Sequence, residues 1–148
     1  MTTDNLKLPK NYSLQGKTAV ITGAAGLLGL VHSRALLSVG ATVILTDIDI
    51  EKLKISKAVL SQEFDASSVH LYVMDVTSEE SVESVYKSVK NIGLRVDVLI
   101  NNAAVNPTAS SLVNDIRTTR LENFSLDRWT NELNVGLTGA YLCSKIFG

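Results

Sequence analysis

Cysteine, proline and aromatic residues are scarce in this sequence, and long hydrophobic runs are absent from it. The 148 residues include one cysteine, two prolines and one tryptophan. Because Cys143 has no second cysteine to pair with, an internal disulfide is excluded, and the N-terminal stretch MTTDNLKLPKNYSLQGK lacks the apolar core of a signal peptide. No stretch approaches the roughly 20 apolar residues that span a bilayer. These absences predict a cytoplasmic protein that is not embedded in a membrane.

An excess of either charge is also absent. Fourteen lysines and arginines against fifteen acidic residues leave a formal net charge of -1, so neither a nucleic acid nor an anionic membrane is predicted as a partner. The two histidines, His32 and His70, have no further histidine or cysteine at the spacing of metal ligands, and no metal site is predicted. The composition favours a small-molecule ligand and one domain with a sizeable core.

Short apolar segments alternate with helical patterns along most of the chain. Residues 1–15 are polar and lack periodicity, which predicts an N-terminal arm. Four segments with the β-branched character of buried strands follow. They are Lys17–Thr22, Ala41–Thr46, Val69–Met74 and Val96–Ile100. This alternation predicts, for residues 16–148, an α/β fold with a doubly wound parallel sheet and helices on both of its faces.

The helical segments carry apolar residues at helical spacing. In the first helix, which Gly40 ends, the positions predicted to share one face are Leu28, Val31, Ala35, Leu36 and Val39. A second helix is predicted over 50–64, and a third carries Val82, Val85 and Val89. The last helix is predicted to run from Leu126 to the C-terminus, with Ser125 as its N-cap. Before it, residues 106–125 form a connection longer than a βα loop needs.

The sharpest local signal is the run TGAAGLLG, residues 22–29, directly after the first strand and at the start of the first helix. Glycines at Gly23, Gly26 and Gly29 allow a tight turn, a close approach of backbone N–H groups to a pyrophosphate, and close packing of the helix on the sheet. The position between strand and helix favours a dinucleotide site. The alternative is a flexible turn with no ligand.

Asp47 ends the second strand, 24 positions after Gly23, close to the spacing of an acid that binds ribose in dinucleotide-binding folds. A carboxylate there accepts hydrogen bonds from the ribose hydroxyls and repels a 2′-phosphate, and neither Thr46 nor Ile48 supplies a cation to neutralise one. NAD is therefore predicted over NADP. The alternative is that Asp47 caps the following helix, for which Asp49 is an equally good candidate.

Four motifs together resemble the short-chain dehydrogenases/reductases. They are TGAAGLLG after the first strand, Asp75 with Val76 after the third, NNAA at 101–104 after the fourth, and NVGLTG at 134–139. The resemblance covers about residues 14–148. It implies a Rossmann fold and an NAD-dependent oxidoreductase that transfers a hydride between NAD(H) and a carbonyl or hydroxyl group of a small substrate.

The resemblance also implies roles for particular residues. The acid matching Asp75 contacts the adenine amino group, Val76 lines the adenine pocket, and the NNAA stretch passes along the adenosine ribose. Without the resemblance, Asp75 is as well explained as a capping residue at a strand end. The cofactor-binding set so implied is Gly23, Ala25, Gly26, Leu28, Gly29, Asp47, Asp75, Val76, Asn102, Ala103 and Ala104.

Asn134 is the one predicted catalytic residue. It matches the family's asparagine that helps to hold a water between the cofactor and the catalytic lysine. The family's Ser and its Tyr and Lys, spaced YxxxK, follow a fifth strand, and this sequence predicts a sheet truncated after the fourth strand and following helix. The literal YLCSK at Tyr141 is not predicted to be the catalytic pair, because it shares a helix with Asn134. Tyr141 and Trp129 are predicted to be packing residues.

Two departures from the family's pattern leave its branch open. The glycine spacing TGxxGxxG resembles the extended branch, whereas NNAA and NVGLTG resemble the other main branch. The leading hypothesis is an NAD-dependent oxidoreductase, inactive as this chain alone and a homo-oligomer when complete. The alternative is a non-catalytic protein that binds NAD. The substrate is not readable from the sequence.

Overall fold

The computed structural model describes residues 12–105 and 120–148. Four parallel strands form one sheet in the order β3-β2-β1-β4. The strands are β1 (Thr18–Thr22), β2 (Thr42–Asp47), β3 (Val69–Val73) and β4 (Val96–Ile100). Each lies within one residue of its predicted bounds, and the order is that of the predicted doubly wound sheet. The predicted connection at 106–125 and the predicted arm lie largely outside the described residues.

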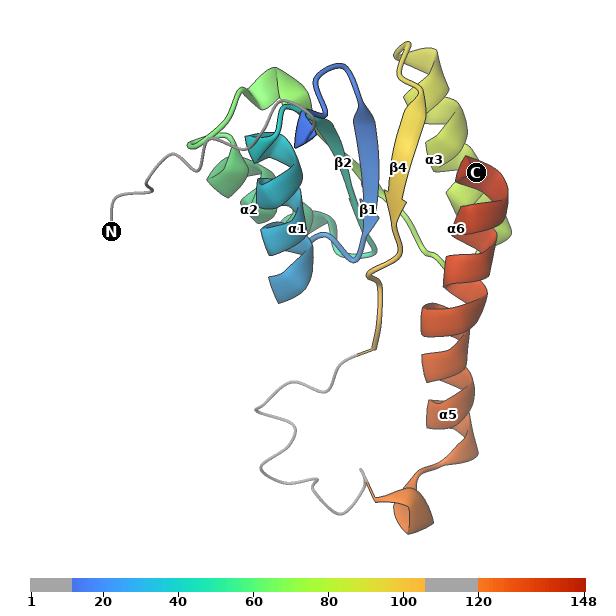
Figure 1. Ribbon diagram of the computed structural model, residues 1–148. Helices are drawn as coiled ribbons and strands as arrows, with labels where there is room; N and C mark the ends of the chain where they lie inside the picture. The colour runs from blue at the N-terminus through green and yellow to red at the C-terminus, as the bar shows by residue number, and fades with distance from the viewer. Residues whose placement is uncertain (1–11, 106–119) are drawn as a thin grey trace.

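Helices cover both faces of the sheet (Figure 1). The helices α1 (Leu27–Ser38) and α2 (Ile50–Leu60) lie on one face, and α3 (Glu79–Asn91) and α6 (Gly139–Phe147) lie on the other. Neighbouring strand residues therefore enter different cores, because side chains alternate along a strand. Val20 packs with the α3 and α6 layer, and Ile21 packs with the α1 and α2 layer. No helix among the described residues is long and apolar enough to cross a membrane.

The prediction for the buried face of α1 was wrong. The buried residues are Gly29, Ser33 and Leu37, whereas Leu28 is 61% exposed and Val31 is 50% exposed. Small residues allow this helix to lie close to the sheet, and the Ser33 hydroxyl donates to the Gly29 carbonyl oxygen at 2.7 Å. The buried face of α1 is therefore selected by small side chains that permit a close approach to the sheet, and not by the most hydrophobic positions.

The other helices agree better with their patterns. In α3, Val82, Val85 and Val89 are buried as predicted, and Ser78 caps the helix by accepting from the Ser81 N–H at 3.2 Å. The helix α2 ends at Leu60, before the predicted residue 64, and the chain then turns with the Phe64 N–H donating to the Leu60 carbonyl oxygen. Two short 3₁₀ helices, Ala66–Ser68 and Leu121–Asn123, complete the elements outside the last helix.

The last helix is one run with a wide turn inside it. It comprises α5 (Leu126–Leu133), a π-helical segment η4 (Asn134–Thr138) and α6. Its start at Leu126 and its cap Ser125, which accepts from the Arg128 N–H, are as predicted. The α6 end packs on the sheet, and α5 projects beyond it (Figure 1).

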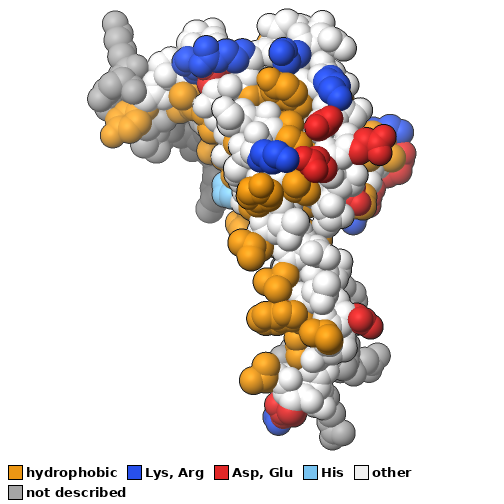
Figure 2. All heavy atoms as spheres, turned by 90° about the vertical axis from the view of Figure 1, so that its right-hand side faces the viewer, with side chains coloured by type: hydrophobic (Ala, Val, Ile, Leu, Met, Phe, Trp, Pro, Cys, Tyr) orange, Lys and Arg blue, Asp and Glu red, His pale blue; other side chains and the backbone are white. Residues whose placement is uncertain are grey.

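The predicted packing roles of Trp129 and Tyr141 were wrong. Trp129 lies on α5, which extends past the sheet, and is 52% exposed, and Tyr141 on α6 is 62% exposed. Figure 2 shows hydrophobic side chains along the projecting part of the molecule. We call this set the apolar stripe, and it consists of Leu126, Trp129, Leu133, Leu137 and Tyr141.

Candidate functional site

A hollow of about 210 Å³ lies at the carboxyl end of the sheet. In a doubly wound sheet, ligands bind at this edge, where the crossovers on the two sides of the sheet diverge. Six of the residues predicted to bind the cofactor line the hollow, and they come from four separate segments of the chain. They are Gly23, Asp47, Asp75, Val76, Ala103 and Ala104.

The remaining predicted residues lie beside the hollow and do not line it. Ala25, Gly26, Leu28 and Gly29 belong to the glycine turn and the first turn of α1. Asn102 binds the backbone of that turn, with its Nδ2 donating to the Thr22 and Gly23 carbonyl oxygens at 2.9 and 3.0 Å. Asn134 begins the π-helical segment, next to Val135, which does line the hollow.

Four lining residues were not predicted from the sequence. Ile48 and Met74 adjoin Asp47 and Asp75, so the strand ends themselves were the signal that could have identified them. Val105 extends the NNAA stretch by one residue. The fourth is Val135.

Close packing at Gly139 accounts for the position of Val135. A Cβ at Gly139 would lie 2.7 Å from Cγ2 of Val76, so the absence of a side chain lets the helix approach the β3–α3 loop. No local sequence signal indicates that approach. It follows from packing between residues 63 positions apart in the chain, since 139 minus 76 is 63.

The three glycines of the turn differ in what the fold requires of them. Gly23 has a φ of +61°, and a Cβ there would lie 2.9 Å from the Ala103 Cα. A Cβ at Gly29 would lie 2.6 Å from the Ala24 Cα. At Gly26, by contrast, the nearest atom to a Cβ is the Gly23 carbonyl oxygen at 3.3 Å. The fold therefore excludes a side chain at Gly23 and Gly29, but it nearly tolerates one at Gly26.

The carboxylate of Asp47 faces the glycine turn. Its Oδ2 accepts from the Ala25 N–H at 3.2 Å, and its Oδ1 accepts from the Asp49 N–H at 3.1 Å. Asp49 itself caps α2 by accepting from the Glu51 and Lys52 N–H groups, and these bonds, the Lys52 N–H foremost, lower its pKa. Of the two cap candidates for α2, the cap is therefore Asp49.

A compact hydrogen-bond network joins the NNAA stretch to β1. The Thr22 hydroxyl oxygen accepts from the N–H groups of Asn102 and Ala103 at 2.9 and 3.0 Å. Farther along, the Asn101 Nδ2 donates to the Ser144 hydroxyl on α6 at 3.1 Å. These bonds hold the strand ends that border the hollow in fixed relation to one another.

Asp75 stabilises the turn before α3 and also borders the hollow. Its Oδ1 accepts from the Thr77 N–H at 2.9 Å and from the Thr77 hydroxyl at 2.7 Å, which stabilises the turn before α3. The same residue lines the hollow. Among the described residues, none donates a hydrogen bond to its other carboxylate oxygen, which leaves that oxygen for an amino group in the hollow.

The YLCSK residues do not line the hollow. Tyr141 is exposed, and the Lys145 Nζ lies 2.6 Å from the Glu79 carboxylate, which raises the pKa of the lysine. Cys143 is buried, and its burial raises the pKa of the thiol to about 11. A thiol of that pKa is protonated at neutral pH and is a poor nucleophile.

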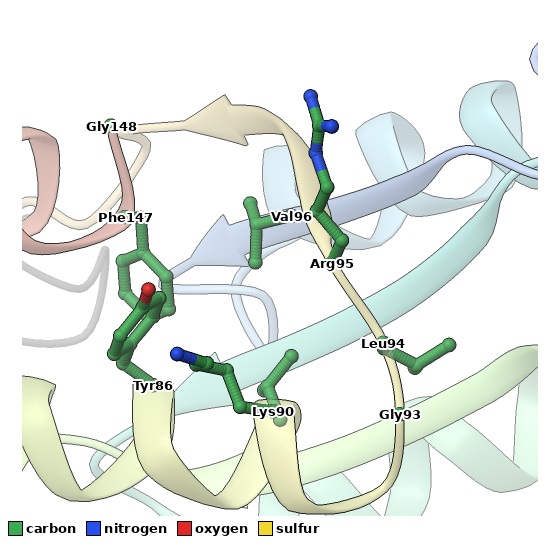
Figure 3. A pocket seen from close by; sticks show the side chains of 9 residues that line it. Tyr86, Lys90, Gly93, Leu94, Arg95, Val96, Phe147 and Gly148 are labelled. Atoms are coloured by element: carbon green, nitrogen blue, oxygen red, sulfur yellow. The ribbon is translucent and has the colours of Figure 1, made fainter.

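A larger hollow, of about 590 Å³, lies at the opposite end of β4 (Figure 3). Its walls come from the end of α3, the start of β4 and the end of α6, and include Tyr86, Lys90, Arg95 and Phe147. None of the residues predicted to bind a cofactor lies there. We assign the candidate site to the smaller hollow because Gly23 of the glycine turn, the end of β2 and the residues that follow β3 and β4 converge on it.

Known proteins share this arrangement. The family model described as short chain dehydrogenase matches residues 17–147. A short chain dehydrogenase/reductase of Gibberella zeae is 32% identical over 90% of this chain and 45% of its own length. A 3-oxoacyl-[acyl-carrier-protein] reductase of Aquifex aeolicus is 29% identical over 89% and 49%. The structure of an NAD+-bound xylitol dehydrogenase is 30% identical, with a TM-score of 0.71 over 90% of this chain and 47% of that one.

The chain thus spans about half the length of the first curated relatives that it matches. The match nevertheless extends through every described strand and helix from β1 to α6. Sequence motifs, strand order and family match agree, and the chain belongs to the short chain dehydrogenase family.

Proposed function

We propose that this chain binds NAD as part of an oxidoreductase that moves a hydride between NAD(H) and a carbonyl or hydroxyl group of a small substrate. The bound nicotinamide would supply the hydride chemistry, and the protein would supply position and electrostatics. The observation that carries the proposal is the convergence of Gly23, Asp47, Asp75 and the NNAA stretch on one hollow.

The surroundings of Gly26 support the proposal that a pyrophosphate binds at the glycine turn. The fold itself makes little demand for glycine there, so its role is best explained by a ligand that comes close to the backbone. The N-terminus of α1 has no side-chain cap and no acidic residue in its first turn, which leaves its N–H groups and positive dipole end for an anion. Gly26, the N-cap of α1, would thus lie against the phosphates.

The charges around the hollow support NAD over NADP. Its lining contains the carboxylates of Asp47 and Asp75 and neither lysine nor arginine. A ribose with free hydroxyls can donate to Asp47, whereas a 2′-phosphate would bring negative charge against that carboxylate. The 30% identical xylitol dehydrogenase was solved with NAD+ bound, in keeping with this assignment.

Asn134 is proposed as the catalytic residue of this part of the protein. It begins a π-helical segment, and the Gly139 N–H donates to its carbonyl oxygen. Such wide turns occur often at functional sites. We propose that Asn134 holds a water through which a proton reaches the substrate oxygen.

A titration with the two reduced cofactors tests this function. Wild-type protein is expected to bind NADH more tightly than NADPH, and Asp47→Ala is expected to narrow the difference, because each hydrogen bond to a charged carboxylate contributes about 1.5 to 3 kcal/mol. Cofactor fluorescence gives both dissociation constants. Equal constants in the wild type would refute the preference for NAD, and no binding of either would refute the proposed function.

The apolar stripe supports a homo-oligomer in the complete protein. Its members lie along the last helix, part of which projects from the sheet, and their exposed fractions in the monomer range from 39% for Leu133 to 75% for Leu126. Exposed apolar surface of this extent along one helix face favours burial against another chain. A second copy would present the same stripe, as a two-fold interface requires.

A further inference from the structure

We infer that Asp47 is a positioning residue for the glycine turn, in addition to its contact with ribose. This inference rests on the proposed function. In the described residues, Asp47 is the only side chain that accepts from an N–H group of the turn between Gly23 and Gly29, through its bond to Ala25. The N–H groups of Ala24 and Gly26 donate instead to backbone oxygens, those of Thr46 and Gly23.

The place of Asp47 at the end of β2 makes it suited to this task. Its carbonyl oxygen accepts from the Met74 N–H at 2.9 Å, and Asp47 pairs with Val73, so the end of β3 fixes its backbone. The preceding residue, Thr46, accepts the Ala24 N–H at 2.9 Å through its carbonyl oxygen. Two successive residues of β2 thus bind two successive N–H groups of the turn, one through the backbone and one through the carboxylate.

The carboxylate of Asp47 can hold the glycine turn and bind ribose at the same time. An ionised carboxylate has about four lone-pair sites. Two are occupied by the Ala25 and Asp49 N–H groups, one on each oxygen. The remaining two match the two vicinal hydroxyls of a ribose. Asp47 therefore links the ribose subsite to the backbone that approaches the pyrophosphate, and its loss should weaken both contacts.

The two roles predict different results for two probes. Adenosine carries the ribose without the pyrophosphate, and ADP-ribose carries both. If Asp47 only binds ribose, Asp47→Ala lowers the affinity for both probes by the same factor, and the ratio of their dissociation constants is unchanged. If Asp47 also positions the turn, the affinity for ADP-ribose falls more than the affinity for adenosine. We then expect the ratio of the two affinities to shrink by about fivefold, which corresponds to the loss of one hydrogen bond.

Asp49→Ala provides the matched control. It removes a carboxylate two positions away that caps α2 and does not contact the glycine turn. We expect this variant to lower the melting temperature while leaving the ratio of the two dissociation constants unchanged. Asp47→Asn is a second test, and it preserves the shape of the side chain. It removes one of the two acceptor oxygens, because a single amide oxygen cannot accept as the two carboxylate oxygens do.

Amide hydrogen exchange of the free protein gives a readout that needs no cofactor. We expect the Ala25 N–H to exchange faster in Asp47→Ala and to be unaffected in Asp49→Ala. Unchanged exchange at Ala25, or an unchanged ratio of ADP-ribose to adenosine affinity in a folded Asp47 variant, would overturn the inference while leaving the proposed function intact. Failure of wild-type protein to bind ADP-ribose would instead refute the proposed function, and exchange at Ala25 would still decide the positioning role.

Discussion

Three glycines follow strand β1, and the fold makes different demands on each of them. Substitution of Gly26 by valine is expected to abolish binding of NADH while leaving helical content largely intact, because the branched side chain blocks the approach of the phosphates. Circular dichroism and a cofactor titration measure the two effects. Gly29→Ala is the comparison, and it should reduce stability, because its Cβ would lie 2.6 Å from the Ala24 Cα. Binding that survives Gly26→Val would indicate an ordinary turn.

At the residue scale, the residues predicted correctly to line the hollow were those with a recognisable motif or spacing. Asp47 was identified by its spacing from the glycine turn, and Asp75 by its resemblance to the family's acid after the third strand. Ile48 and Met74 line the same hollow, but an apolar residue beside a strand end looks the same whether it faces a ligand or the core. The bond from Asp47 to Ala25 was not predicted either, because it depends on how the turn folds back toward β2.

At the scale of elements, the helix α1 shows why an apolar pattern can mislead. Leu28 and Val31 fit a helical stripe, yet the stripe that packs on the sheet consists of Gly29, Ser33 and Leu37. A pattern based on hydrophobicity ranks glycine and serine low, although their small size is what allows a helix to lie close to a strand. For α3, where β-branched residues fill the gap, Val82, Val85 and Val89 agreed with the pattern.

The approach of α6 to the β3–α3 loop gives a prediction for this element. Gly139→Ala should destabilise the protein by about 1 to 3 kcal/mol, because the new Cβ would lie 2.7 Å from Cγ2 of Val76. Gly136→Ala is a matched control on the same helical run, since a Cβ there has no atom within 4 Å. Alanine should be neutral or stabilising at that position. Urea unfolding of the two variants measures the difference, and equal effects would contradict the role assigned to Gly139.

At the scale of the whole molecule, two exposed surfaces of the described residues favour association with another chain. β4 is an edge strand of the sheet, and the apolar stripe lies along the projecting helix. We expect the 148-residue chain to self-associate at concentrations used for sedimentation analysis, because an exposed strand edge and an exposed apolar helix face both favour pairing with another chain.

A pair of charge-adding variants tests the part played by the stripe. Leu137→Glu should weaken self-association by about tenfold or more, since it places a charge in the proposed interface. Asn131→Glu adds the same charge on an exposed position of α5 outside the stripe, and it should have little effect. A wild-type chain that stays monomeric across the concentration range would show that the stripe is not an interface between copies.

We expect this chain to bind NADH without catalysing hydride transfer. The hollow brings together groups for the cofactor, but the tyrosine and lysine of YLCSK do not border it: Tyr141 is 62% exposed, and Lys145 is paired with Glu79. General acid–base catalysis typically contributes about 10²- to 10⁴-fold to a rate. Because no tyrosine, lysine or histidine among the described residues lines the hollow, we expect the chain to bind NADH and to fail to oxidise it. NADH absorbance with a panel of carbonyl substrates measures turnover, and Tyr141→Phe should change nothing. Turnover in the wild type that Tyr141→Phe abolishes would make YLCSK the active pair and would require the last helix to rearrange so that Tyr141 reaches the cofactor.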